Sequence, residues 1–198
     1  MEVLEVKGAL IFLKLLDGIG FLKPYLFSSI LFKRAKEMRF FYGTLGPFNL
    51  RRTVYIMDFD KESQQRILRV AADKNEGRPT EELDGRIARV LELHPEFDSI
   101  WEEGEMASAP REINGMIVNP FVHTVLHVTI DRQLQLGDPE FVAAAYQRLT
   151  SQGMELHEAL HAIIAIYANL HFASTRRAEQ FDALDYETQI NGLSYNAG

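Results

Sequence analysis

Residues 119–136, NPFVHTVLHVTIDRQLQL, contain the clearest helix signals in the chain. Asn119 followed by Pro120 is typical of a helix start, because an asparagine side chain caps free backbone N–H groups and proline fits the first helical turn. The stretch is mostly apolar and carries His123 and His127, which are four residues apart. It therefore predicts a long, largely buried helix with two imidazole rings on one face.

Helix signals recur on both sides of this stretch, and no alternating apolar pattern typical of strands accompanies them. The segment 106–118 contains glycine and proline breaks and is interpreted as a loop, and the longest helix is expected from about residue 155 to about residue 178. Short connections imply antiparallel neighbours. We therefore predict an all-α fold, an antiparallel helical bundle with an N-terminal helical arm. Residues that start or end the predicted helices are Asp58 or Asp60, Thr80, Pro95, Asp138 and Gly153.

Charge divides the chain into unequal parts. Residues 1–56 hold nine Lys and Arg against four Asp and Glu, whereas residues 57–198 hold twelve against twenty-four. The Gly- and Pro-containing loop GTLGP at 43–47 lies just before this change. We predict a basic, aromatic-rich arm or extension at 1–56, a helical bundle domain at 57–178, and a C-terminal tail at 179–198 that frays or wraps the surface.

The composition excludes several function classes. The chain has no cysteine, which leaves histidine and carboxylate as metal ligands and excludes thiolate chemistry. The acidic body argues against nucleic-acid binding by the main domain. A glycine-rich phosphate loop does not occur, which argues against nucleotide chemistry, and a G-x-S-x-G motif does not occur, which argues against serine hydrolysis. No organic cofactor is predicted.

The N-terminal arm carries the expectations on location and partners. Its apolar run at 8–32 is interrupted by lysines, an aspartate and a proline, so we expect no transmembrane helix. We also find no secretory signal and expect a cytoplasmic protein. The arm is a candidate for contact with a protein partner or a membrane surface, because it is basic and amphipathic.

Two histidine pairs are the chemically distinctive feature. His123/His127 and His157/His161 each have a spacing of four residues, which places two imidazoles about one helical turn apart. Asp131 continues the first spacing by one more turn. If the two helices are antiparallel neighbours, four imidazoles converge in the bundle core, where a divalent ion such as Zn, Fe or Ni finds neutral nitrogen ligands. The same rings, without metal, would form a hydrogen-bonded polar core in an interaction or structural protein.

The second pair also matches a known catalytic pattern. Residues 157–161, HEALH, fit the H-E-x-x-H motif of zinc hydrolases, in which the glutamate, here Glu158, activates a zinc-bound water. Such an enzyme needs a further ligand downstream, for which Glu179 or Asp182 is available. A metallohydrolase is therefore an alternative, and whether the chain is an enzyme stays open.

Two other histidines complete the set. His94 lies on the same apolar stripe as Ile87 and Val90, which makes it a candidate fifth ligand or a hydrogen-bond partner of a ligand, together with Glu96. The sequence favours a different role for His94, that of a ring at a helix C-terminus stabilised by the helix dipole. The His171 side chain is expected to pack against its neighbours and not to serve as a ligand.

Several short motifs occur in an order that resembles a known family. They are His94-Pro95-Glu96, Asn119-Pro120-Phe121 with His123 and His127, Gln133, and His157 with His161. Over about residues 60–172 the chain resembles the bacterial domain of unknown function 1841 family. The resemblance implies a small helical domain of bacterial origin without an established activity.

Overall fold

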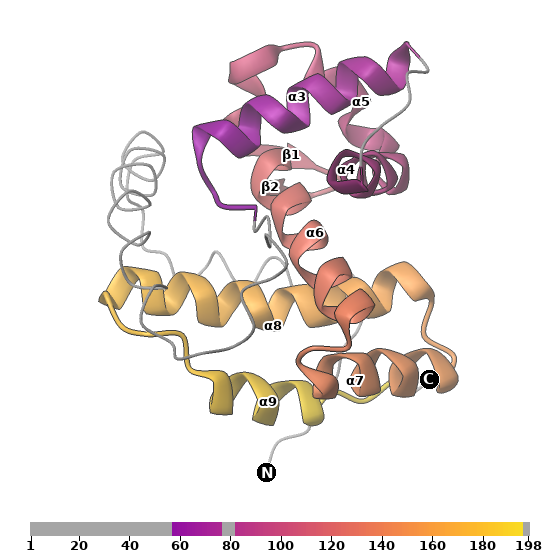
Figure 1. Cartoon of the computed structure of the whole chain (residues 1–198), viewed down its shortest axis with the longest axis vertical. Coiled ribbons are helices and arrows are strands. Elements are labelled where there is room, and N and C mark those ends of the chain that lie inside the picture. The colour runs from indigo at the N-terminus through magenta and orange to yellow at the C-terminus, as the bar shows by residue number, and fades with distance from the viewer. Residues whose placement is uncertain (1–56, 77–81, 196–198) are drawn as a thin grey trace. The chain divides into compact units, whose positions relative to one another are not determined.

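The structure is a computed structural model that describes residues 57–76 and 82–195. Figure 1 shows that the described chain is mostly helical with one small pair of strands, which confirms the all-α prediction. The chain forms two compact units that divide after Val128. We call the described residues up to Val128 the upstream unit and residues 129–195 the downstream unit. The predicted arm at 1–56 and the predicted cap Thr80 lie outside the described residues.

Helices α3 (Lys61–Asn75) and α4 (Glu82–Leu93) pack against each other in the upstream unit. Asp60, one of the two residues predicted as a cap, begins α3, because its carboxylate accepts a hydrogen bond from the backbone N–H of Ser63 at 2.9 Å. A buried carboxylate, that of Asp84, then ties α4 to α3. The contact between α3 and α4 is therefore polar as well as apolar.

Asp84 accepts hydrogen bonds from two arginines of α3. The Nε of Arg66 donates to one carboxylate oxygen, and Arg69 donates to the other at 2.9 Å. Burial alone raises the pKa of Asp84, but the two guanidinium groups outweigh it and hold the pKa below its ordinary value. The carboxylate is therefore kept ionised and fixes the spacing of α3 and α4.

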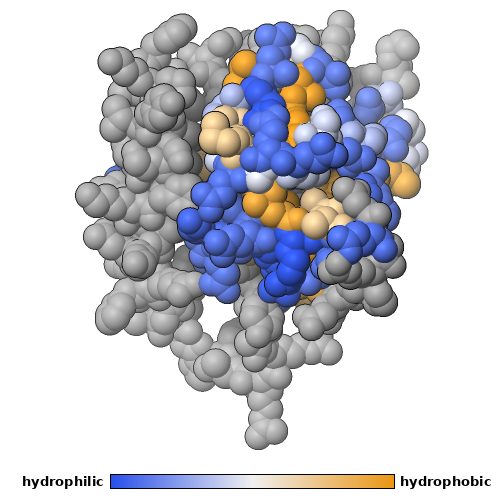
Figure 2. Space-filling model, turned by 90° about the horizontal axis from the view of Figure 1, so that it is seen from above, coloured by the Kyte–Doolittle hydropathy of each residue, from blue (hydrophilic) through white to orange (hydrophobic). Residues whose placement is uncertain are grey.

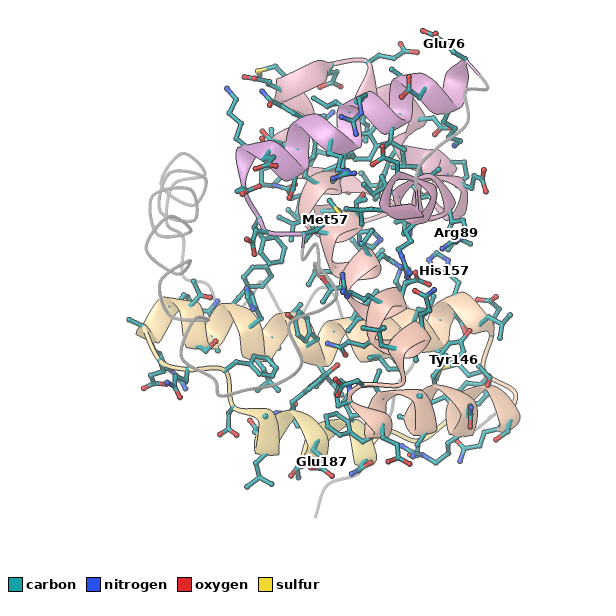
Figure 3. All side chains as sticks on the ribbon, in the orientation of Figure 1. Met57, Glu76, Arg89, Tyr146, His157 and Glu187 are labelled. Carbon is teal, nitrogen blue, oxygen red and sulfur yellow. The ribbon has the colours of Figure 1, made fainter. Side chains whose placement is uncertain are left out.

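A proline ends α4 and short helices follow. These are η2 (Pro95–Phe97), α5 (Asp98–Trp101) and η3 (Gly104–Ser108), and Pro95 ends α4 as predicted because it has no N–H to donate. Met57, labelled in Figure 3, is buried at the start of the upstream unit. Apolar side chains from every part of this unit form its core, which includes Ile67, Val70, Ile87, Leu91, Phe97, Trp101, Val118, Phe121 and Val125.

The segment predicted to be a loop contains a β-hairpin, so the prediction of no sheet was wrong at this point. Strands β1 (Arg111–Ile113) and β2 (Met116–Val118) pair antiparallel through the turn Asn114-Gly115. Both turn residues have positive φ, 52° and 80°, as a tight hairpin turn of this kind requires. Strands of three residues are too short to produce an alternating pattern, which is why the sequence periodicity missed them.

Helix α6 (Pro120–Leu136) begins and ends where the sequence predicted. The Asn119 side-chain oxygen accepts hydrogen bonds from the backbone N–H groups of Phe121 and Val122, at 3.0 and 3.2 Å. The same side chain donates to the carbonyl of Ser108 at 2.7 Å, which fixes the helix start to the end of η3. The first turns of α6, which carry His123 and His127, are thus held firmly within the upstream unit.

Three helices that pack on one another follow in the downstream unit: α7 (Glu140–Ser151), α8 (Leu156–Arg177) and α9 (Ala183–Asn191). Figure 1 shows α7 and α8 running antiparallel across a short connection. Helix α8 has 22 residues and is the long helix that the sequence predicted. Its buried face includes four alanines, whose small side chains let neighbouring helices approach closely: Ala159, Ala162, Ala165 and Ala168.

Residues after Arg177 were predicted to be a tail, but they form the packed helix α9. Asp182 caps it by accepting from the backbone N–H groups of Leu184 and Asp185. On its inner face Tyr186 and Ile190 are buried. The prediction missed α9 because the helix has only nine residues and few apolar ones.

The surface of the described residues is mixed. Figure 2 shows hydrophilic side chains surrounding smaller apolar patches on the face that it draws. Among residues 57–76 and 82–195, no helix is long and apolar enough to cross a membrane.

Candidate metal centre

His94 sits at the junction between α4 and η2. Its backbone leaves the helical region, with φ −127° and ψ 62°, because a residue before proline avoids the helical conformation. The residue is 2% exposed, and its ring stacks on Phe97, with centroids 5.1 Å apart and an interplanar angle of 12°. The short segment 94–97 therefore buries an imidazole in a fixed plane.

His123 and His127 face the same interior from α6. Their ring centroids are 4.6 Å apart, as expected for residues one turn apart on a helix, and both side chains are buried. The first histidine pair of the sequence analysis thus lies side by side on one helix face.

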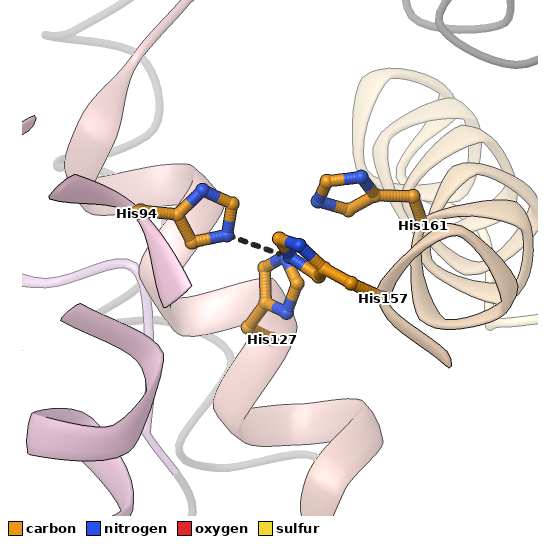
Figure 4. Close-up of side chains that lie close together, drawn as sticks. All are labelled: His94, His127, His157 and His161. Atoms are coloured by element: carbon orange, nitrogen blue, oxygen red, sulfur yellow. Dashed lines mark hydrogen bonds between the residues drawn. The ribbon is translucent and has the colours of Figure 1, made fainter. Parts of the chain in front are cut away.

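The three buried rings meet through their Nε2 atoms. Nε2 of His94 lies 2.9 Å from Nε2 of His123 and 3.1 Å from Nε2 of His127. The contact between His94 and His127 is the dashed line in Figure 4. Ligand nitrogens around a tetrahedral zinc ion are about 3.3 Å apart, given bonds near 2.0–2.1 Å. The spacing of these nitrogens is therefore close to that of ligands of one ion.

Glu96 holds the other side of the His94 ring. Its Oε1 lies 2.9 Å from Nδ1 of His94. An ionised carboxylate can only accept, so Nδ1 carries the proton, and Nε2 of a neutral His94 ring is left with one lone pair. With a neutral His94 ring and no ion, only that single lone pair is available to the two neighbouring Nε2 atoms of His123 and His127. An ion would accept electron pairs from all three nitrogens, which suits the geometry better.

His157 and His161 form the second pair, at the start of α8 in the downstream unit. Their ring centroids are 4.2 Å apart, and both side chains are half-buried. Glu155 fixes this helix start, since its carboxylate accepts from the backbone N–H groups of His157 and Glu158 at 2.7 and 3.1 Å. The start of α8, which carries both histidines, is therefore stabilised by a helix cap.

The predicted carboxylates differ from the histidines in their settings. Asp131 is half-buried on α6, and Glu158 is exposed in the first turn of α8. Neither belongs to a group of described residues that could hold an ion. Asp182, suggested as a downstream zinc ligand, caps α9, and Glu179 lies 3.9 Å from Arg177. Their roles in metal binding or catalysis stay predictions.

His94 has neighbours that the sequence did not predict. As expected, its ring follows the C-terminus of α4, but the structure also buries it against two other histidines. Its place on an apolar stripe and the proline after it were the available signals.

His171 packs as expected, since its ring stacks on Tyr167 with centroids 5.7 Å apart, and burial lowers the pKa of His171.

Fold and site together define an all-α protein with a buried histidine cluster. Over residues 59–192 the chain matches the family model described as Domain of unknown function (DUF1841), and it belongs to this family. The match includes both histidine pairs, the segment 94–97 and helix α9. Neither a curated protein nor a solved structure matches the chain.

Proposed function

We propose that the chain binds a divalent transition-metal ion through imidazole nitrogens. The observation that carries the proposal is the approach of Nε2 of His123 and His127 to Nε2 of His94, at 2.9 and 3.1 Å, in a buried setting. For a neutral His94 ring, hydrogen bonding offers one Nε2 lone pair to two neighbouring nitrogens, whereas an ion accepts a lone pair from each of the three rings. The cluster is therefore better suited to a metal ion than to a metal-free polar core.

The proposed ligand set extends to the second pair. His94, His127, His157 and His161, the side chains drawn in Figure 4, all offer imidazole nitrogens, the donors that such an ion prefers. His123, hydrogen-bonded to His94, is a further candidate ligand of this set. This proposal follows the sequence prediction of two pairs serving one site, with His94 added.

The donor chemistry limits the choice of ion. Neutral imidazole suits Zn, Fe and Ni, whereas Ca and Mg prefer carboxylate, carbonyl and water oxygens. We therefore propose a Zn, Fe or Ni ion. The proposal assigns metal binding and no reaction. The H-E-x-x-H alternative has no further support, because Glu158 is exposed and the described residues suggested as a third ligand have other contacts.

Metal analysis of the full chain tests the proposal. The purified protein is stripped of metal and loaded separately with Zn, Ni or Fe(II), and bound metal is measured by mass spectrometry after gel filtration. We expect one ion per chain with at least one of these metals. Absence of stoichiometric binding by all of them would contradict the proposal.

Two double variants and a control locate the site. We expect both His94→Ala/His127→Ala and His157→Ala/His161→Ala to lose the ion, whereas His171→Gln keeps it, because His171 contacts aromatic rings and not the cluster. Retention of the ion by the His157→Ala/His161→Ala variant would contradict the four-histidine set and confine the site to the upstream unit. Equal loss in His171→Gln would indicate a general effect on folding.

A further inference from the structure

The segment His94-Pro95-Glu96-Phe97 fixes the His94 ring in two independent ways. Phe97 lies parallel to the ring and sets its plane. Glu96 contacts Nδ1 and so distinguishes the two edges of the ring. Turning the imidazole over would bring a C–H group to the carboxylate in place of the N–H and would lose this hydrogen bond. The two neighbours together leave one orientation, with Nε2 toward His123 and His127.

Glu96 also decides which nitrogen carries the proton. A neutral imidazole has one N–H and one lone pair, and a carboxylate attracts the N–H. The hydrogen bond therefore stabilises the tautomer with the proton on Nδ1 and the lone pair on Nε2. That tautomer is the one that can bind an ion through Nε2, and a carboxylate partner of this kind makes a ligating histidine a better donor.

We infer that Glu96 is a positioning residue of the metal centre, which acts through His94 by fixing its orientation and tautomer. The inference about the tautomer stands on the geometry of the upstream unit alone. Its consequence for metal affinity rests on the proposed function. Glu96 itself is one-third exposed at its side chain, so it lies at the edge of the buried cluster.

Tautomers are measured directly by long-range ¹H–¹⁵N correlation spectra of metal-free full chain with ¹⁵N-labelled histidine. In the native protein we expect His94 to show a protonated Nδ1 and an unprotonated Nε2. Glu96→Ala removes the acceptor, and we expect His94 to shift toward the opposite tautomer. Glu96→Gln keeps an acceptor oxygen without the charge, and we expect it to restore the native tautomer. An unchanged tautomer in Glu96→Ala would overturn the inference.

Zinc affinity provides the second readout. We expect Glu96→Ala to weaken zinc binding about 10- to 100-fold, the range for loss of such a partner, and Glu96→Gln to weaken it less. Glu92→Ala is the matched control, because Glu92 is an exposed glutamate on the last turn of α4 and its loss changes the charge equally. The control is expected to keep native affinity and the native His94 tautomer. Equal affinity loss in both alanine variants would contradict a specific role of Glu96.

Failure of this inference and failure of the proposed function give different results. If the native chain binds no zinc but Glu96→Ala changes the tautomer, then Glu96 positions His94 and the metal proposal is wrong. If the native chain binds zinc and Glu96→Ala alters neither the tautomer nor the affinity, then metal binding stands and the role of Glu96 is refuted.

Discussion

His94→Ala is expected to weaken zinc binding by about two to three orders of magnitude. His94 is the ring whose Nε2 contacts those of both His123 and His127, so the variant removes a ligand and the point at which the cluster meets. Structural zinc sites with four ligands bind with about 10–16 kcal/mol, so an average ligand contributes about 2.5–4 kcal/mol. At 1.4 kcal/mol for each factor of ten, this corresponds to about 10²- to 10³-fold in affinity.

The loss is measurable as a change in thermal stability. Zinc at about 100 times its dissociation constant for the native chain stabilises the folded state by about 2.7 kcal/mol. For a chain of this length, that raises Tm by about 5–11 °C. At the same zinc concentration, a variant weakened about 100-fold gains only about 0.4 kcal/mol, or about 1 °C. Only ligands that bind the folded state contribute such a gain.

Differential scanning calorimetry with zinc or with a chelator is the assay, and each variant is compared with its own zinc-free Tm. This comparison removes the destabilisation that truncation of a buried ring causes by itself. His171→Gln, at a half-buried histidine outside the cluster, is expected to retain the native zinc-dependent gain. A gain in His94→Ala equal to that of the native chain would refute the assignment of His94 as a ligand.

Other predictions concern the fold. Asp84→Asn is expected to lower the free energy of unfolding by about 1–3 kcal/mol, because both arginines lose a charged acceptor. Folding lowers the pKa of Asp84, so the stability that this carboxylate contributes is fully present above its ordinary pKa of 3.8 and is lost as the pH falls through the folded pKa. The free energies of unfolding of the native chain and of Asp84→Asn should therefore converge in acid, and a failure to converge would contradict this. Gly115→Ala is expected to lower the free energy of unfolding, measured with urea, by about 1 kcal/mol. The backbone φ of 80° strains an alanine, and no heavy atom lies within 4 Å of the added methyl group to offset this strain by packing. The lowered pKa of His171 is expected to reduce the free energy of unfolding of the metal-free chain as the pH falls below 6.5, because the unfolded ring takes up a proton before the folded one. If His171→Gln shows the same dependence of this free energy on pH, the prediction is contradicted.

The helices that the sequence predicted well are those whose ends are set by local chemistry. Asn119 caps α6 and Asp60 caps α3 through contacts within three residues, so the signal is contained in a short segment. The two histidine pairs were visible for the same reason, because a spacing of four residues fixes neighbours on any helix. Local patterns of this kind do not depend on the rest of the fold.

The features that the sequence missed depend on contacts between distant residues or on very short elements. His94 meets His123 and His127 across 29 and 33 residues of chain, and nothing in its own segment specifies those partners. Helix α9 is stabilised by packing and by Arg148, which donates to the carbonyls of Ile190 and Leu193. Such contacts exist only once the helices have assembled, so they could not be derived from periodicity.

X-ray absorption spectroscopy of the zinc-loaded full chain tests directly whether the ion is bound through imidazole nitrogens. The proposed site predicts a shell of nitrogen ligands at about 2.0–2.1 Å, together with the outer-shell scattering that imidazole rings produce, for at least three histidines. A shell of oxygen ligands without imidazole scattering, or no bound zinc at all, would contradict the account.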